Sequence, residues 1–344
     1  MSDVPHLRFP EFRGEWDIYE IGDVLCIGNG RDYKHLSKGD IPVFGTGGYM
    51  TSVNECLHEG ETTFIGRKGT INKPFYYNGK FWTVDTLFYT HSFKYVIPKF
   101  VYCLFQTINW LRYNEASGVP SLSKDTIEKI KVRIPQLDEQ KKIAKFLSLL
   151  DERIATQNKI IEKLQSLIKG IAHRVAGMGK PNVCLKECLE CTSSTLQESE
   201  VSDLGPYPVY GANGIVGFLD SYNTPDEAIY IVKDGSGVGS VAYVKGKCSA
   251  TGTLNILTAK QDYSLQFLYY MLKVFNFEPY KTGMAIPHIY FKDYSKAKIF
   301  CSSYSKQLRY AKMLEAIDAK LLIEQKVFIS LNSQEQYLLR LMFI

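Results

Sequence analysis

Three cysteines stand at a spacing that suits an iron–sulfur cluster. The segment Cys184–Cys191 has the pattern C-x3-C-x2-C, by which radical S-adenosylmethionine enzymes bind a cluster through their thiolates. A long internal repeat, described below, places Asp17, Ile21 and Val24 at the equivalent positions of the other copy. These residues indicate an ordinary packed face at helical spacing rather than such a ligand set, and free cysteine behaves as a small buried hydrophobic residue, so we interpret the cysteines as structural.

Other motifs that resemble catalytic signatures are incomplete. Asn72-Lys73-Pro74-Phe75 resembles the Asn/Asp-Pro-Pro-Tyr/Phe motif of amino-methylating DNA methyltransferases, but lysine replaces the first proline. The run Gly235–Gly239 lacks the acidic residue that a dinucleotide site needs further along the chain. The sequence has no P-loop lysine motif, no paired-carboxylate nuclease pattern and no histidine pair at metal-ligand spacing. We therefore expect no catalytic residue, no metal site and no cofactor in this chain.

A basic turn is the first candidate for binding chemistry. Arg67 and Lys68 precede Gly69, and Lys73 follows closely. Arginine and lysine donate hydrogen bonds to guanine edges and to phosphates, so this turn is a candidate DNA contact, with a solvated hairpin turn as the alternative. The corresponding basic residues of the second half of the chain are Lys233, Lys245 and Lys247.

Glycine- and proline-containing loops supply the other candidate contacts. Two of them, 45–49 and 211–214, contain glycines that allow close approach of the backbone to a partner; simple turn formation explains them equally well. Two later loops, 117–123 and 283–288, each contain a proline that we interpret as structural. The candidate DNA contacts in these loops are Gly47, Tyr49, Ser121, Asn213 and His288.

These segments follow a long internal repeat. FVYCLF at 100–105 matches FLYYML at 267–272, an offset of 167 residues that also brings Pro120 onto Pro287. Upstream the offset is 166, because IPVFGTGG, which starts at Ile41, matches YPVYGANG, which starts at Tyr207. One single-residue gap reconciles the two offsets. Register kept over half a chain indicates a duplication.

Each copy has the same order of expected elements. Short β-rich runs broken by glycine, such as 61–70 and 227–237, precede a helical stretch around 98–115 or 264–275. A loop, a short strand and a long helix complete the copy. The predicted fold class is α+β, with two globular domains separated by two long helices. The expected boundaries are 1–135 for the first domain, 136–176 for the first helix, 177–302 for the second domain and 303–344 for the second helix.

The two long helices share an apolar seam whose steps alternate between four and three residues. Such steps average 3.5 residues, the period of a left-handed coiled coil. Thirty or more residues make about 50 Å of helix, so we expect the helices to pack on each other; packing of each on its own domain is the alternative. The seam positions are Ile143, Leu147, Leu150, Ile154, Gln157, Ile161 and Leu164 in the first helix, and Leu314, Ile317, Leu321, Glu324, Phe328 and Leu331 in the second.

Composition agrees with a two-domain intracellular protein. The 344 residues are 45% hydrophobic, enough for two ordinary cores. The net charge of +5 permits a nucleic-acid partner without requiring one, since a local basic face matters more than the total. Eight scattered cysteines suggest reduced thiols. No signal peptide or membrane span is recognised, so we expect a cytoplasmic location.

Several segments resemble the specificity subunit of type I restriction–modification systems. They are LRFPEFRGEW near the start, FIGRKGTINKPFYYNGKFWTVDTLFY, the strand-to-helix passage IPQLDEQKKIAKFLSLLDERI and its counterpart SKQLRYAKMLEAIDAKL. The resemblance covers essentially the whole chain, and the duplicated strand-to-helix passage is its most specific part. The chain departs from the pattern at Glu335, which interrupts the seam of the second helix.

The resemblance implies that each globular part is a target-recognition domain that reads one half of a bipartite, asymmetric DNA site. The two helices would form an antiparallel coiled coil that fixes the spacing of the half-sites. They would also recruit two modification (methyltransferase) subunits, and restriction (nuclease/translocase) subunits would complete the complex. S-adenosylmethionine, ATP and Mg would be bound by those partners, and this chain would itself be no enzyme.

Two alternatives remain open. The chain could be a nucleic-acid-modifying enzyme in its own right, or a coiled-coil scaffold protein. The divergence of the two copies favours the specificity subunit, because a scaffold needs no two different surfaces. Arg67 and Lys68 in the first copy, for example, correspond to Lys233 and Asp234 in the second.

Overall fold

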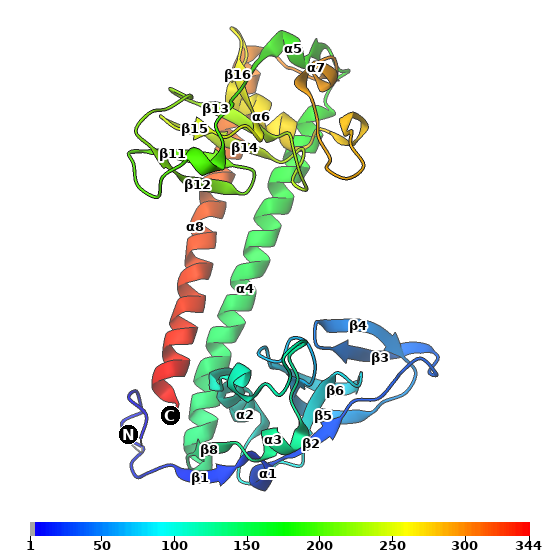
Figure 1. Ribbon diagram of the computed structural model, residues 1–344, viewed down its shortest axis with the longest axis vertical. Coiled ribbons are helices and arrows are strands. Elements are labelled where there is room, and N and C mark those ends of the chain that lie inside the picture. The colour runs from blue at the N-terminus through cyan, green and yellow to red at the C-terminus, as the bar shows by residue number, and fades with distance from the viewer. Residues whose placement is uncertain (1–3) are drawn as a thin grey trace. The chain divides into compact units, whose positions relative to one another are not determined.

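The computed structural model describes residues 4–344, which form two compact units. The first unit comprises Met1–Gln157 with Val327–Ile344, and the second comprises Asn158–Lys326. Two long helices, α4 (Leu137–Ala176) and α8 (Tyr304–Met342), each contribute to both units (Figure 1). The strands form sheets in the chain segments outside these two helices, which confirms the predicted α+β class.

The first unit contains a six-stranded sheet in the order β2-β7-β5-β6-β3-β4. All neighbouring strands are antiparallel except β3 and β6. A separate two-stranded sheet pairs β1 with β8, directly before α4. The strands are β1 (Asp17–Glu20), β2 (Cys26–Asn29), β3 (Lys38–Gly45), β4 (Gly48–Val53), β5 (His58–Gly66), β6 (Phe75–Thr83), β7 (Leu87–His91) and β8 (Lys131–Ile134), and the short helices are α1 (Ile21–Val24), α2 (Pro98–Thr107), η1 (Trp110–Tyr113) and α3 (Lys124–Glu128).

The second unit repeats this plan, but its larger sheet is divided into two. Its sheets have the orders β10-β16-β13-β14, β12-β11-β15 and β17-β9. The strands are β9 (Val183–Cys184), β10 (Leu189–Ser193), β11 (Tyr207–Gly211), β12 (Gly214–Leu219), β13 (Ala228–Val232), β14 (Val241–Val244), β15 (Ser249–Ala250), β16 (Leu254–Ala259) and β17 (Lys298–Ile299). The short helices are α5 (Leu185–Cys188), η2 (Glu198–Glu200), α6 (Leu265–Lys273), η3 (Glu278–Tyr280) and α7 (Phe291–Tyr294).

Each unit has a core that both long helices help to close. In the first unit, Ile143 and Leu147 near the start of α4 and Leu339 near the end of α8 join a buried cluster around Phe100. In the second unit the opposite ends of the two helices meet: Ala172 near the end of α4 shares a buried cluster with residues near the start of α8, such as Leu314. The helices are therefore antiparallel, as predicted, and every seam position named above is buried or half-buried.

Buried glutamines fix the start of each long helix. The Gln140 side chain accepts a hydrogen bond from the Ile97 amide (3.0 Å) and donates one to the Pro135 carbonyl (2.8 Å). The Gln307 side chain accepts from the Ser264 amide (3.0 Å) and donates to the Ser302 carbonyl (2.9 Å). These contacts join the first turn of α4 to the start of α2, and the first turn of α8 to the start of α6.

Two expectations for local structure are wrong. The helical stretch around 98–115 is interrupted, because α2 ends at Thr107 and Ile108 has an extended backbone before the short 3-10 helix η1. Segment Cys184–Cys191 and its counterpart do not lie on one helical face: the cysteines fall on β9, α5 and β10. Within residues 4–344 there is no cluster of His, Cys, Asp or Glu suited to hold a metal ion, and no helix there is long and apolar enough to span a membrane.

Candidate nucleic-acid interface

The basic turn of the first unit directly follows β5 and is held by backbone hydrogen bonds on both sides. The Arg67 amide donates to the Thr86 carbonyl (2.8 Å), in the turn between β6 and β7. The Leu122 amide donates to the Arg67 carbonyl (2.9 Å). The Gly69 amide donates to the Pro120 carbonyl (2.8 Å). The turn is thus anchored to the loop 117–123.

The second unit contains the same three hydrogen bonds. The Lys233 amide donates to the Thr253 carbonyl (2.9 Å), and the Ile289 amide donates to the Lys233 carbonyl (2.9 Å). The Gly235 amide donates to the Pro287 carbonyl (2.9 Å). Each pair of partners matches that of the first unit at an offset of 166 or 167 residues. We call this arrangement the two-loop frame. It consists of a turn (67–69 or 233–235) and the proline-containing loop bonded to it (117–123 or 283–288), which we call the proline loop.

A glycine with positive φ is built into both frames. Gly69 has φ +88° and Gly235 has φ +93°, a region in which residues with a Cβ are strained. The amide of each glycine donates to a proline carbonyl of the neighbouring loop. The backbone carbonyls of both prolines are therefore hydrogen-bond acceptors at the junction of the loops.

The candidate side chains of the first frame differ in exposure. Lys68 is exposed and forms a β-bridge with Ser121 across the two loops. Arg67 is half-buried: its guanidinium donates to the Asp85 carbonyl (3.3 Å) and lies 5.8 Å from the centre of the Phe88 ring. Lys73 is exposed on the segment between β5 and β6. The structure thus brings Lys68 and Ser121 together on one accessible edge.

The β3–β4 hairpin borders this frame. A Cβ on Gly69 would lie 3.8 Å from the Thr46 hydroxyl oxygen, so the hairpin tip and the basic turn are neighbours. Gly47 and Tyr49 are exposed at this tip. The Val84 amide anchors the hairpin by donating to the carbonyl at the end of β3 (3.0 Å).

The corresponding hairpin of the second unit joins β11 to β12, and Asn213 is exposed at its tip. The Thr251 amide donates to the Tyr210 carbonyl (2.9 Å), the counterpart of the Val84 contact. In the second frame His288 is half-buried, and its amide and carbonyl both bond to Thr282. Its ring lies 5.1 Å from that of Tyr290, centre to centre.

Lys245 and Lys247 lie apart from the second frame. Lys233 directly follows the end of β13, whereas Lys245 follows the end of β14, which pairs with the start of β13. Lys245 Nζ lies 2.8 Å from a Glu315 carboxylate oxygen on α8, and this hydrogen bond lowers the pKa of Glu315. Lys247 Nζ lies 5.0 Å from the centre of the Tyr222 ring. The sequence grouped these lysines with Lys233, but the structure separates them.

Two features of the frames are not among those predicted from the sequence. The Asp85–Thr86 segment anchors Arg67 through backbone atoms, for which residue types give no signal. Exposed aliphatic side chains also stand at the tips of the proline loops, Val119 in the first unit and Ile286 in the second. The sequence contains a signal for these two residues, since each directly precedes the proline that the repeat aligns.

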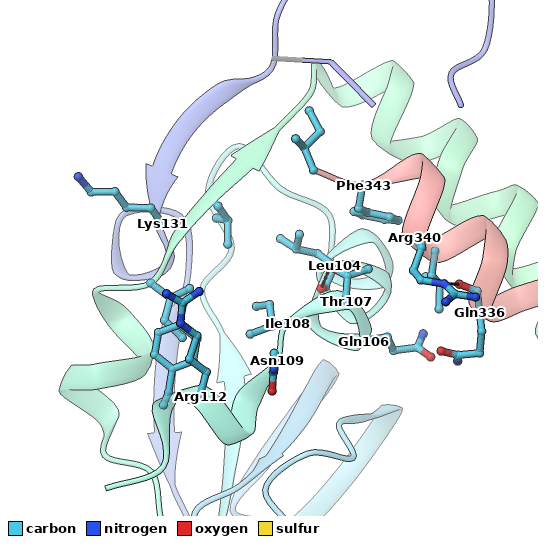
Figure 2. Close-up of a pocket in the computed structure, with 15 residues that line it drawn as sticks. Leu104, Gln106, Thr107, Ile108, Asn109, Arg112, Lys131, Gln336, Arg340 and Phe343 are labelled. Carbon is cyan, nitrogen blue, oxygen red and sulfur yellow. Dashed lines mark hydrogen bonds between the residues drawn. The ribbon is translucent and has the colours of Figure 1, made fainter. Parts of the chain in front are cut away.

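A cavity of about 530 Å³ lies on another part of the first unit. Its lining comes from α2 and η1, from β8 with Lys131, from the end of α8 with Arg340, and from Phe343 just beyond α8 (Figure 2). The second unit has a counterpart of about 480 Å³, whose lining includes Asn276 and Lys298, the repeat partners of Asn109 and Lys131 in the first. The duplication therefore includes surface hollows next to the long helices.

Comparisons with known proteins agree with this duplicated architecture. A family model described as type I restriction modification DNA specificity domain matches residues 13–166 and again residues 180–332. The type I restriction enzyme MjaVIII specificity subunit of Methanocaldococcus jannaschii is 33% identical over 206 residues, 52% of this chain and 45% of the relative. The EcoprrI specificity subunit of Escherichia coli is 26% identical over 112 residues, 33% of this chain and 28% of the relative. The matches thus span less than half the length of these curated relatives.

Solved structures show the same fold. The S subunit of a type I restriction-modification system from M. genitalium superposes with a TM-score of 0.72 at 18% identity, covering 99% of both chains. A chain from a structural study of complex assembly and conformational transition of the type I R-M system gives a TM-score of 0.53 at 15% identity, covering 94% of this chain and 96% of the other. The family model matches both copies of the repeat, and together the two matches account for most of the sequence. The chain therefore belongs to the family of type I restriction–modification DNA specificity proteins.

Proposed function

We propose that this protein is the sequence-specific DNA-binding subunit of a type I restriction–modification complex. Each two-loop frame, with its neighbouring hairpin, reads one half of a bipartite site. The candidate contacts are Arg67, Lys68 and Lys73 with Gly47, Tyr49 and Ser121 in the first unit, and Lys233, Asn213 and His288 in the second. The contacts of Lys245 and Lys247 with other parts of the second unit leave them as weaker candidates.

The observation that carries this proposal is a conserved backbone frame with divergent side chains. The same three interloop hydrogen bonds occur in both units, so the frame holds its loops in one geometry. The position next to the anchor is the exposed Lys68 in the first copy and the half-buried Asp234 in the second. Lysine donates to guanine or phosphate, whereas aspartate accepts from cytosine. Two equal frames with different donors and acceptors suit an asymmetric site.

Catalysis belongs, in this proposal, to partner subunits. Two modification subunits would bind at the repeat-related surfaces of the long helices, and restriction subunits would complete the complex in the cytoplasm. S-adenosylmethionine, ATP and Mg would be bound by these partners.

An exposed apolar groove between α4 and α8 in the first unit supports docking of a modification subunit, since Phe146, Leu149 and Tyr337 line it. The second unit exposes Met313, the repeat partner of Phe146. Exposed apolar patches of this kind are typical of protein interfaces.

A domain exchange tests the two-reader arrangement. Residues 183–300 are replaced by the matching segment of a relative, which keeps Asn182 and Cys301, whose contacts close the base of the second domain. Methylated adenines are then mapped in a host that carries the complete system. We expect one half-site to change and the other to stay the same. A simultaneous change of both half-sites would contradict the proposal.

A second experiment tests where catalysis resides. The isolated protein, incubated with S-adenosylmethionine and DNA, should transfer no methyl groups. Addition of the modification subunits should start the transfer at the mapped sites. Methylation by the pure protein would overturn the non-catalytic assignment and favour the enzyme alternative.

A further inference from the structure

Both proline loops expose a β-branched aliphatic side chain at the same position. Val119 and Ile286 are each 66% exposed, and each directly precedes the proline whose carbonyl joins the two loops. The repeat aligns the two residues at the 167-residue offset. A single exposed aliphatic residue is ordinary on a protein surface. The same exposed type at the same place in both copies calls for a shared role.

The loop bases hold these tips in a fixed position. In the first unit the Glu115 amide donates to the Ser121 carbonyl (2.9 Å), and the Asn114 side chain also accepts from the Ser121 amide (2.8 Å). In the second unit the Thr282 amide donates to the His288 carbonyl (2.9 Å), the repeat counterpart of the Glu115 contact. Each loop is thus closed below its tip, and the tip itself remains accessible.

The neighbours of the tips are polar, basic in the first unit and of both charges in the second. Lys68 bridges to Ser121, two residues after Val119, and Arg67 bonds through its carbonyl to Leu122. In the second unit the backbone of Lys233 bonds to Ile289, three residues after Ile286, and Asp234 bridges to His288. An apolar tip beside hydrogen-bonding polar groups, with at least one basic residue in each frame, fits a polyanion that also offers apolar surface and base edges. Double-stranded DNA has this chemistry, because the thymine C5 methyl group lies in its major groove.

We propose that Val119 and Ile286 are specificity-determining residues, one in each recognition domain, that pack against a thymine methyl group of its half-site. This inference rests on the proposed function and names a contact that charge alone does not provide. Basic side chains of the frame would position the loops on phosphates or guanine edges. The aliphatic tips would then distinguish A·T from G·C pairs by van der Waals contact and burial of the methyl group.

The test uses the complex with its modification subunits and the duplex site mapped by adenine methylation. Each half-site found in this way contains a thymine opposite the methylated adenine. Both variants keep a β-branched side chain: Val119→Thr replaces a methyl group by a hydroxyl group, and Ile286→Thr replaces an ethyl group by a hydroxyl group. Ile18→Thr is the matched control, since Ile18 is 60% exposed on β1, outside both frames. Thermal melting of each variant checks that the fold is unchanged.

We expect Val119→Thr to weaken binding of the specific duplex about fivefold, the scale of one lost methyl contact. The affinity of Val119→Thr for an unrelated duplex should not change. The control Ile18→Thr should bind both duplexes with the wild-type affinity, within the error of the measurement. Uracil in place of thymine removes only the C5 methyl group. Uracil in one half-site should weaken binding by the wild-type protein. It should cause no additional loss in the variant whose threonine replaces the residue that contacts that half-site. Ile286→Thr should behave in the same way toward the other half-site.

Two outcomes separate this inference from the proposed function. If wild type prefers the mapped site, but the two threonine variants bind it equally well or the uracil and protein changes are additive, the methyl contact is wrong and the proposed function stands. If wild type shows no preference for the mapped site over a scrambled one, the proposed function itself fails, and the inference fails with it.

Discussion

Arg67 and Lys233 occupy the same position in two copies of one backbone frame, but their surroundings differ. Arg67 is followed by Lys68, and Lys233 is followed by Asp234. A second cation strengthens attraction to phosphate, whereas a carboxylate weakens it and can accept from cytosine. Because the frame is fixed by backbone hydrogen bonds, the side chains can vary without loss of geometry. At this scale, we expect specificity to depend on the side chains that an unchanged scaffold presents.

Alanine at the basic turn should distinguish phosphate contacts from base contacts. Arg67→Ala and Lys68→Ala are each expected to weaken DNA binding. A phosphate contact would lower the salt slope by about one and affect all sequences alike, whereas a base contact would relax one position by about 1–3 kcal/mol. Binding at several salt concentrations, to specific and unrelated duplexes, measures both effects.

Lys80→Ala is the matched control for this experiment. Lys80 is exposed and pairs with Glu59 at the opposite end of β5, about 25 Å from the basic turn at about 3.3 Å per residue. Its removal changes net charge equally but should leave the salt slope unchanged. Equal effects of Lys80→Ala and Lys68→Ala would show general charge attraction rather than a local contact.

A half-buried carboxyl group predicts a pH-dependent stability of the first unit. Burial, followed by a hydrogen bond with Asp151, raises the pKa of Glu335 from 4.5 to about 7. Lys99, whose Nζ lies 3.4 Å from the Asp151 carboxylate, opposes this shift. The folded protein therefore holds a proton that the unfolded chain has released between pH 4.5 and 7. Stability from this group is present at acidic pH and is lost as pH rises through about 7.

Glu335→Gln removes this titration. Relative to wild type, we expect the variant to have a higher Tm at pH 8 and a smaller advantage, or none, at pH 5. Exposed Glu152 on α4 provides the control, since Glu152→Gln removes the same charge without the buried hydrogen bond. A difference in Tm between Glu335→Gln and wild type that is the same at both pH values would refute this assignment.

At the scale of elements, each long helix closes two cores. Phe343, just beyond α8, packs against Trp16 and Phe100 of the first unit. Val175, near the end of α4, belongs to the core of the second unit. Removal of either helix end would therefore expose a globular core. The glutamines at the helix starts and these apolar residues at the ends together make the helices integral parts of both units.

The polar positions of the seam should be replaceable by leucine. Gln157 and Glu324 are buried, and Glu324 also pairs with Lys320. Buried polar groups fix register but can lower stability compared with apolar residues. The double variant Gln157→Leu/Glu324→Leu is expected to keep the free energy of unfolding or to raise it by about 1–4 kcal/mol.

Leu314→Ala, at a fully buried seam position, is the control and should lose about 2–5 kcal/mol. Chemical denaturation measures the free energy of unfolding, and hydrogen exchange along α4 and α8 reports whether their alignment has loosened. A loss of stability in the double leucine variant comparable to that of the control would mean that the polar residues stabilise the seam.

Sequence periodicity predicted the helices and strands better than it predicted the contacts between them. The seam around Ile143 and Leu147 marks a long helix because spacing of apolar residues directly reflects helical geometry. The end of α2 at Thr107 was missed, since a change to extended backbone at Ile108 leaves no such pattern. The interloop hydrogen bonds, such as that between Gly69 and Pro120, join backbone atoms of residues far apart in sequence. Residue types carry little information about such pairs.

For the whole molecule, duplication and antiparallel helices have a consequence for the proposed DNA site. α4 has 40 residues and α8 has 39, which correspond to about 60 Å of helix each at 1.5 Å per residue. Both helices contribute to both compact units. We expect their length to determine the number of base pairs between the half-sites, while the loops of each unit determine which bases are read.

Insertion of one heptad in each helix tests this expectation. Seven residues placed after Asn158 and after Gln325 keep the apolar seam in phase. They add about 10 Å of helix, which corresponds to about three base pairs at 3.4 Å each. The sites still methylated by the assembled complex should have unchanged half-sites and a longer spacer. Insertion in α4 alone is the control and should disturb pairing of the helices.

The rotation of the DNA groove complicates the activity but not the readout. A spacer longer by about three base pairs turns one half-site by about 100° relative to the other, since one helical turn takes about 10.5 base pairs. Methylation is therefore expected to be slower in the lengthened protein. The spacer in the sites that are methylated decides the question, because it depends on geometry rather than rate. A folded, active complex that still methylates only sites with the original spacer would show that the helices do not set the distance.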